Sequence, residues 1–191
     1  MNTIADKPAS QPAIKKRFKF LRRFYKDERG SNAIEFVILI FPFTLMMFAV
    51  IETGVSFAAQ QIISNATDDV ARSLRVNTIS QANATPAAIR DAICDQISVL
   101  VATGCPDLYI DLREFATFSE VPLTIPRTGT GDLDTSGFQI TPGGSGKKNI
   151  MRVFYKWPVM GDFMRRSLAE LPNGKTLLYA TLTWKNEPYV E

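Results

Sequence analysis

The chain has 191 residues, of which 46% are hydrophobic and 21% charged, a composition typical of proteins that bury a core. It contains no histidine, which excludes histidine-based catalytic triads, histidine proton shuttles and histidine-ligated zinc sites. Its two cysteines are too few for a thiolate metal cage, and the composition also excludes collagenous, coiled-coil and wholly disordered chains.

The formal net charge of +3 conceals an uneven distribution of charge. Residues 1–30 carry nine basic and three acidic side chains, net +6, and the rest of the chain is net −3. The basic block from Lys15 to Arg29 directly precedes the most apolar stretch of the chain. Aromatic side chains interleave with the basic ones, as in some nucleic-acid-binding segments. Because the block lies beside an apolar run, lipid headgroups are the favoured partner and nucleic acid is not expected.

The most apolar stretch is Phe36–Ile51, an uncharged run of 16 residues bounded by Glu35 and Glu52. A membrane-spanning helix needs about 20 apolar residues, which a helix over Ser31–Ala59 supplies with its ends in the interfaces. Pro42 is tolerated in such a helix, where it can kink the axis. The alternative, a buried helix of a soluble core, is less favoured because the run has no polar face.

The flanking charges predict how the chain crosses the membrane. By the positive-inside rule, residues 1–30 form a cytoplasmic leader, residues 31–54 the span and residues 55–191 a domain on the far side. A secretory signal peptide is the alternative, since it also joins a basic region to an apolar one. The apolar run exceeds the usual length, however, and Ile51-Glu52-Thr53 offers no small-x-small cleavage site.

Beyond the span, apolar residues at spacings of three and four predict that the first helix continues to about Val76. The polar run 77–84 ends it. Thr85 is the expected N-cap of a second helix, with Pro86 at its first position and Gly104 as its stop. The apolar positions of this second helix are Ile89, Ile93, Ile97 and Leu100.

After residue 105 the apolar period changes to two. The alternation predicts strands at about 108–118, 151–157 and 177–184, with a short helix at 163–171 between the last two. A glycine-rich loop spans 126–149 and has a possible short strand near 138–141. A loop of this length is typical either of a contact surface or of surface disorder. The element order predicts an α+β fold, with a long helix packed on a small antiparallel sheet.

No catalytic motif emerges from the sequence, and no cofactor or metal site is expected. The segment Gly143-Gly144-Ser145-Gly146-Lys147-Lys148 lacks the spacing of a phosphate-binding loop. The acidic pairs are expected to be solvated, although Asp132 and Asp134 in the glycine loop could hold a weak calcium ion. These pairs are Asp68-Asp69, Asp107/Asp111 and Asp132/Asp134.

A more specific pattern lies where the basic leader meets the span. Arg29-Gly30-Ser31 is followed by Glu35, the fifth residue after the glycine, and then by the apolar helix. This arrangement resembles the class III signal of type IV prepilins. The string RGSNAIEFVILIFPFTLMMFAVIETG further resembles the TadE branch of the Tad (Flp) pilus system, in which a proline lies within the span and a second glutamate at its outer end. Pro42 and Glu52 stand in those places.

The resemblance extends more loosely to about residue 189, through Cys94, Cys105 and the closing segment Trp184-Lys185-Asn186-Glu187-Pro188. It implies a pilin-like plan for the fold, in which the outer half of the first helix packs on the sheet. From the residues alone, Cys94 and Cys105 are either two free thiols or, in an exported domain, a disulfide. Cysteine pairs at similar positions in TadE-like chains imply the disulfide.

The resemblance also implies a processing step and a role for one carboxylate. A prepilin peptidase would cut after Gly30, whose missing side chain allows close approach to the backbone. The cut would leave a charged amine on Ser31 at the membrane edge. Glu35 would pair with the amine of a neighbouring subunit during assembly. Ser31 departs from the phenylalanine usual there in major pilins of other branches.

Two functions from different classes follow. The first is a processed pseudopilin or minor pilin needed to assemble a Tad pilus. It would be located in the bacterial inner membrane or incorporated into the pilus, and adhesion is an expected role of such a pilus. Its implied partners are the prepilin peptidase, other Tad pilins and pseudopilins, and the inner-membrane assembly platform. The second is an uncleaved single-span scaffold that recruits pilus or secretion components through its basic arm.

Overall fold

The computed structural model describes residues 31–122 and 124–189. The chain divides into two compact units at Met47/Phe48, and each is described by itself. The predicted leader, with Gly30, lies outside the described residues. Helix α2 (Ser31–Arg75) includes Pro42 without interruption and ends one residue before the predicted Val76. In its part up to Met47, nearly all described side chains are exposed.

The second unit begins with the rest of α2. One face of this part of the helix contributes buried residues to the larger hydrophobic core: Ala59, Ile63, Ala66, Val70, Ala71 and Leu74. A short connection containing the 3₁₀ turn η2 (Gln81–Asn83) leads to helix α3 (Pro86–Ile97). The Thr85 side chain accepts a 3.2 Å hydrogen bond from the Ala88 N–H, so the predicted N-cap is confirmed.

The predicted end of α3 at Gly104 is wrong. The helix ends at Ile97, and Gly104 lies in a later turn with φ of +78°. The Ser98 hydroxyl donates a 2.7 Å hydrogen bond to the Asp95 carbonyl, the acceptor that another helical residue would use. Leu100 therefore packs against the core from a turn and not from the helix.

Four strands form one sheet in the order β2-β1-β3-β4. The strands are β1 (Leu108–Phe115), β2 (Ile140–Thr141), β3 (Lys148–Pro158) and β4 (Lys175–Lys185). The pairs β1–β3 and β3–β4 are antiparallel, as predicted. The sheet differs from the predicted antiparallel one at its short edge strand, because β2 runs parallel to β1, with Ile140 opposite Leu112. The long connection from β1 doubles back before β2, which makes the parallel pairing possible.

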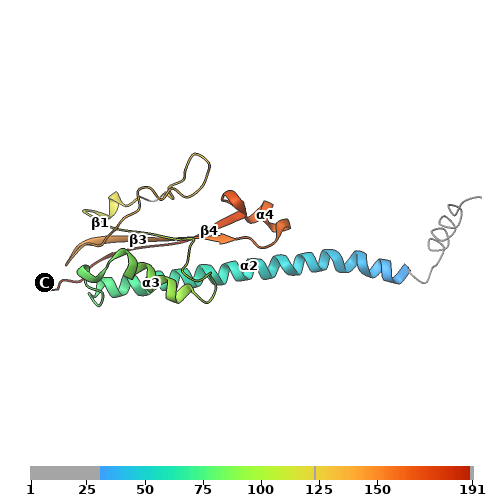
Figure 1. The fold of residues 1–191 in the computed structure, drawn as a ribbon, viewed down its shortest axis with the longest axis horizontal. Helices are drawn as coiled ribbons and strands as arrows, with labels where there is room; N and C mark the ends of the chain where they lie inside the picture. The colour runs from blue at the N-terminus through green and yellow to red at the C-terminus, as the bar shows by residue number, and fades with distance from the viewer. Residues whose placement is uncertain (1–30, 123, 190–191) are drawn as a thin grey trace, which may run out of the picture. The chain divides into compact units, whose positions relative to one another are not determined.

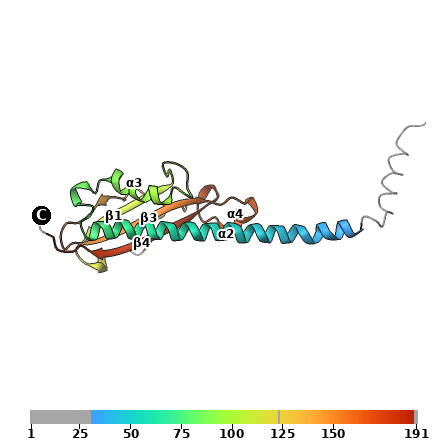
Figure 2. The same ribbon diagram turned by 90° about the horizontal axis from the view of Figure 1, so that it is seen from below.

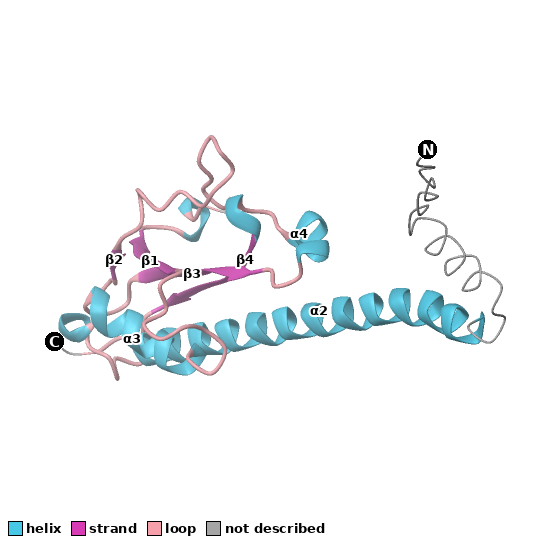
Figure 3. Ribbon diagram, turned by 45° about the vertical axis from the view of Figure 1, so that its right-hand side comes forward, coloured by secondary structure: helices cyan, strands magenta, loops and turns pink. Residues whose placement is uncertain are grey.

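The sheet lies between two layers of different kinds. Figures 1 and 2 show α2 and α3 on one of its faces, with α3 beside β1. Figure 3 shows the long connection between β1 and β3 on the other face. Strand β3 serves both layers, since Met151, Val153 and Tyr155 point to the helices and Phe154 to the connection. Phe154 packs there with Leu133, so the predicted glycine loop is a cover for the sheet.

At one end of the sheet, helix α4 (Asp162–Leu168) and the turn η4 (Pro172–Gly174) connect β3 to β4. The predicted helix at 163–171 thus exists but stops earlier, because the chain must reach η4 and enter β4 at Lys175. The loop between β3 and α4, residues 159–161, returns close to α2, as Figure 1 also shows. The sequence therefore forms an α+β domain in which the part of α2 from Glu52 to Arg75 is held against the sheet and its connections.

Candidate functional site

Ser31 and Glu35, two of the predicted processing and assembly residues, lie at the beginning of α2. Ser31 is helical, and Glu35 lies one turn further along with an exposed side chain. Gly30, the other residue of the predicted cleavage junction, lies outside the described residues. The site residues whose surroundings are described, Cys94 and Cys105, lie far along the chain in the second unit.

Among the described residues, α2 is the one helix long and apolar enough to cross a membrane. Its most apolar 18-residue window has a mean hydropathy of 2.5, and none of that window is buried within the protein. A buried helix of a soluble core, the alternative raised by the sequence, does not describe this segment. An exposed apolar helix of this length is stable when lipid or another apolar surface covers it.

Glu52, at the outer end of the apolar run, joins α2 to the loop before α4. Its Oε1 accepts hydrogen bonds from the backbone N–H groups of Met160, at 2.6 Å, and Gly161, at 3.2 Å. A Cβ atom at Gly161 would lie 2.8 Å from Glu52 Oε2, so a larger residue would displace the carboxylate. The sequence alone predicts no contact for Glu52, because nothing local to either segment signals a pairing across 108 residues.

Two further contacts hold α2 along the sheet. Gln60 pairs with both backbone groups of Tyr179 on the outer strand β4. At the end of α2, the Arg75 carbonyl accepts a 3.0 Å hydrogen bond from the Glu187 N–H, and the two side chains form an exposed ion pair at 3.7 Å. Within the second unit, α2 is thus hydrogen-bonded to the rest of the domain at three positions: Glu52, Gln60 and Arg75.

The closing segment of the chain is anchored by a buried amide network. Asn186 Oδ1 accepts from the Trp184 indole N–H at 2.7 Å and from Asn149 Nδ2 at 3.1 Å. Asn186 Nδ2 donates to the carbonyl of Gly143 at 2.6 Å, and the Gly143 N–H donates to Asn149 Oδ1 at 2.7 Å. Because every member has a partner, the network fixes the glycine-rich turn to the end of the sheet.

A buried ion-pair cluster fixes the long connection to the other face of the sheet. Asp111, whose side chain has 0% exposure, accepts from Arg152 at 2.6 Å and from Arg113 at 2.8 Å. Its second oxygen accepts from the Gln139 N–H at 3.1 Å. The prediction that Asp111 is solvated is therefore wrong, because the connection covers the strand face on which it lies.

Cys94 and Cys105 form a disulfide, with their Cα atoms 5.9 Å apart. The bond closes the turn between α3 and β1. Arg90 spans the same turn, donating to the carbonyl of Leu108 at 2.6 Å and to the carbonyl of Cys105. The pairing that the family resemblance implies is thus present, and a charged side chain supports the same turn from within.

The candidate calcium ligands already have partners in the chain. Asp132 pairs with Lys156 at 2.7 Å, and this hydrogen bond lowers the pKa of the Asp132 carboxyl. Asp134 accepts from the hydroxyl and the N–H of Ser136, which lowers its pKa as well. Across residues 31–122 and 124–189, no cluster of three or more potential metal-ligating side chains is found.

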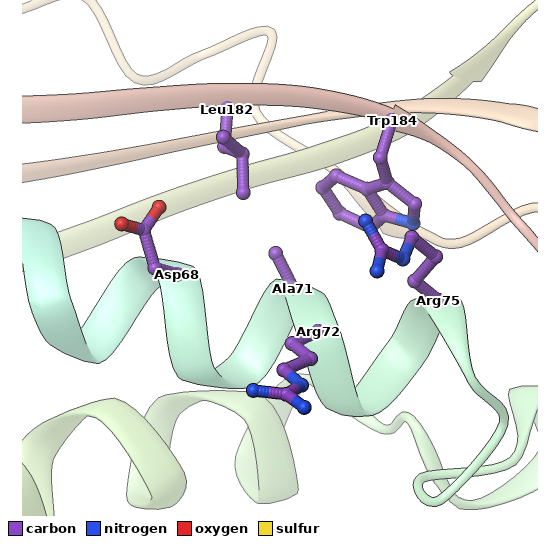
Figure 4. Close-up of a pocket in the computed structure, with 6 residues that line it drawn as sticks. All are labelled: Asp68, Ala71, Arg72, Arg75, Leu182 and Trp184. Atoms are coloured by element: carbon purple, nitrogen blue, oxygen red, sulfur yellow. The ribbon is translucent and has the colours of Figure 1, made fainter.

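A hollow of about 220 Å³ lies between the last turns of α2 and strand β4 (Figure 4). Leu182 and Trp184 point into it from the strand, and Ala71 faces them from the helix. Arg75 approaches the indole of Trp184, and Asp68 and Arg72 stand at its edges. Its volume is below the roughly 300–1,000 Å³ of typical small-molecule sites. The hollow lies at the helix–sheet contact and is lined by both charged and apolar side chains.

These features define a class of protein: an α+β domain joined by one continuous helix to an apolar segment that suits a membrane. The family model described as TadE-like protein matches residues 30–72, from Gly30 through the apolar run and most of α2. The predicted resemblance to TadE-like proteins is confirmed over this segment. The more distant part of the predicted resemblance, from Cys94 onward, lies beyond the matched residues. No curated protein and no solved structure matches the chain.

Proposed function

We propose that the protein is a pseudopilin or minor pilin of a Tad (Flp) pilus. It is held in the inner membrane by α2, with its N-terminus cytoplasmic and its α+β domain periplasmic. The observation that carries this proposal is the TadE-like match over residues 30–72, which begins at the glycine of the predicted processing junction. The exposed apolar surface of α2 supports it, because a pilus subunit must leave lipid and pack this surface against other subunits.

In this proposal a prepilin peptidase hydrolyses the peptide bond between Gly30 and Ser31. Water adds across that bond, leaving a carboxylate on Gly30 and an ammonium on Ser31. Ser31 is already part of α2, so the new charge lies at the end of the helix, one turn before Glu35. A Glu35 carboxylate in the neighbouring subunit neutralises this ammonium when two helices dock at matching heights.

The competing function is an uncleaved inner-membrane scaffold that uses its basic arm to recruit assembly proteins. The intact mass of the chain extracted from membranes of cells that express the whole Tad system separates the two. Our proposal expects the mass of residues 31–191. A full-length mass under these conditions, with other prepilins processed normally, would favour the scaffold.

A further inference from the structure

The apolar run of α2 is short for the membrane that it is proposed to cross. Its 16 uncharged residues give about 24 Å at 1.5 Å per residue, against a hydrocarbon core of about 30 Å. A span that is too short draws its flanking residues into the interface or thins the bilayer locally. Glu52, the first charged residue after the run, must therefore lie at the level of the outer lipid headgroups.

The contact made by Glu52 brings a second segment to the same level. Its carboxylate binds the N–H groups of Met160 and Gly161, so the loop before α4 lies within hydrogen-bonding distance of the end of the apolar run. Figure 1 shows this loop and α4 at the end of the sheet where β3 stops and β4 starts. Of the sheet domain, this end lies nearest to the turn of α2 that carries Glu52.

The side chains of this segment suit a lipid surface. The Met160 side chain is 72% exposed although it is apolar. Arg166 is exposed and makes no hydrogen bond or ion pair with any described residue, whereas Arg165 is paired with Asp162 at 2.9 Å. Met160 and Arg166, both exposed and six residues apart in the chain, match the apolar and the anionic side of the boundary between acyl chains and phosphate groups.

We propose that Met160 and Arg166 form a membrane foot, which rests on the outer headgroup layer of the bilayer that α2 crosses. Met160 inserts among the upper acyl carbons, and the Arg166 guanidinium binds lipid phosphate. The foot fixes how high the domain stands above the membrane and limits rotation of α2 about its own axis. This inference rests on the membrane insertion of the proposed function but not on processing or on pilus assembly.

The foot is tested with single-cysteine variants of the full chain in phospholipid vesicles. Cys94 and Cys105 are joined, so an introduced cysteine is the free thiol for an environment-sensitive fluorophore. Met160→Cys reports on the foot, and Val50→Cys, in the apolar run, reports on insertion. Phe118→Cys is the matched control: Phe118 is also apolar and exposed, and it follows β1 at the opposite end of the sheet.

In vesicles of phosphatidylcholine with phosphatidylglycerol, we expect blue-shifted emission at Met160→Cys and loss of emission with a lipid carrying a shallow nitroxide. Emission at Phe118→Cys stays that of a label in water. Adding Arg166→Glu to Met160→Cys reduces the quenching, whereas Lys185→Glu, at an exposed site at the end of β4 away from α4, leaves it unchanged.

Opposite results identify which statement fails. If Val50→Cys is unquenched, the chain does not insert, and the proposed function falls with the foot. If Val50→Cys is quenched while Met160→Cys behaves like Phe118→Cys, the foot is overturned and the proposed function stands. If the quenching at Met160→Cys is the same with and without Arg166→Glu, the binding of lipid phosphate by Arg166 is overturned. If Met160→Cys becomes shielded only when partner pilins are added, its occupant is a protein and the lipid assignment is wrong.

Discussion

Gln60 of α2 occupies both backbone hydrogen-bonding groups of Tyr179 on β4. Its amide nitrogen donates to the Tyr179 carbonyl at 2.8 Å, and its amide oxygen accepts from the Tyr179 N–H at 3.2 Å. Strand β4 is an edge strand, so these groups face away from β3 and would otherwise be open to another chain. The side chain of a helix thus substitutes for a neighbouring strand at this point.

Replacing Gln60 with alanine is therefore expected to destabilise the helix–sheet contact by about 1–2 kcal/mol, the net value of two partly exposed hydrogen bonds. The measurement is the free energy of unfolding of the full chain in detergent, from denaturant titration. Gln61→Ala is the matched control, because Gln61 is exposed on the same helix. Equal effects of the two changes would show that the Tyr179 contact contributes nothing specific.

Replacing Gly30 with leucine is expected to block processing without preventing membrane insertion. A bulky side chain would keep the peptidase from the Gly30–Ser31 bond, while the apolar run that drives insertion is unchanged. Gly54→Leu serves as the control, since Gly54 is an exposed glycine of α2 beyond the apolar run. The readout is the electrophoretic shift between full-length and mature chains in membrane fractions. A Gly30→Leu chain that still matures would exclude this cleavage site.

Glu35→Ala is expected to separate processing from assembly. A peptidase that reads mainly the glycine junction still cuts this chain, so the mature mass is expected. In the assembled state the Ser31 ammonium of a neighbour would lack its carboxylate, and removing one member of a buried pair costs about 3–5 kcal/mol. We expect loss of pili and of co-purification with partner pilins, whereas Asp69→Ala, at an exposed carboxylate of α2, preserves both. Normal pili from the Glu35→Ala chain would refute the pairing.

The disulfide prediction concerns both accessibility and stability. Alkylation of the exported protein without reductant is expected to label neither Cys94 nor Cys105, and reduction is expected to expose both. Replacing both with serine removes a short covalent loop and costs about 2–3 kcal/mol of unfolding free energy. Arg90 still holds the turn through its backbone contacts, so the variant is expected to fold. Full alkylation of the unreduced native protein would contradict the pairing.

Asp111→Ala is expected to be the most destabilising of these changes. It leaves the Arg152 guanidinium, 5% exposed, without its carboxylate, at a cost of about 3–5 kcal/mol. Asp132→Ala is the matched control, because the pair that it forms with Lys156 is partly exposed and contributes about 0–1 kcal/mol. Proteolysis within residues 124–139 offers a second readout, since Asp111 anchors this connection through Gln139. Similar losses of stability from both changes would refute a special role for the cluster.

The sequence predicted the elements whose signals are local. Period and capping located α2, α3 and the three long strands, because Thr85-Pro86 and the alternation around β3 depend on neighbours in the chain. The same patterns gave a wrong prediction for Asp111, because it alternates with the buried apolar residues Ile110 and Leu112 and is therefore expected to be exposed. Its environment is set by a connection that returns over the sheet more than ten residues later.

The candidate site divides in the same way. The Gly30–Glu35 motif and the apolar run are contiguous, so sequence resemblance found them and the TadE-like match covers them. The partners of Glu52 and Asn186 are set by tertiary packing, across 108 residues for Met160 and 43 for Gly143. No local periodicity encodes such pairs.

The bonds of α2 to the sheet impose an order on biosynthesis. The ribosome makes Gln60 well before its partner Tyr179, 119 residues later, and Arg75 long before Glu187. Until the strands emerge, the apolar face formed by Ala59, Ile63, Ala66 and Val70 has no sheet to cover it, and β4 completes that sheet last. The apolar surface of the nascent helix therefore stays exposed while the rest of the domain is synthesised. Contacts of such high sequence separation also form slowly, which prolongs this exposure.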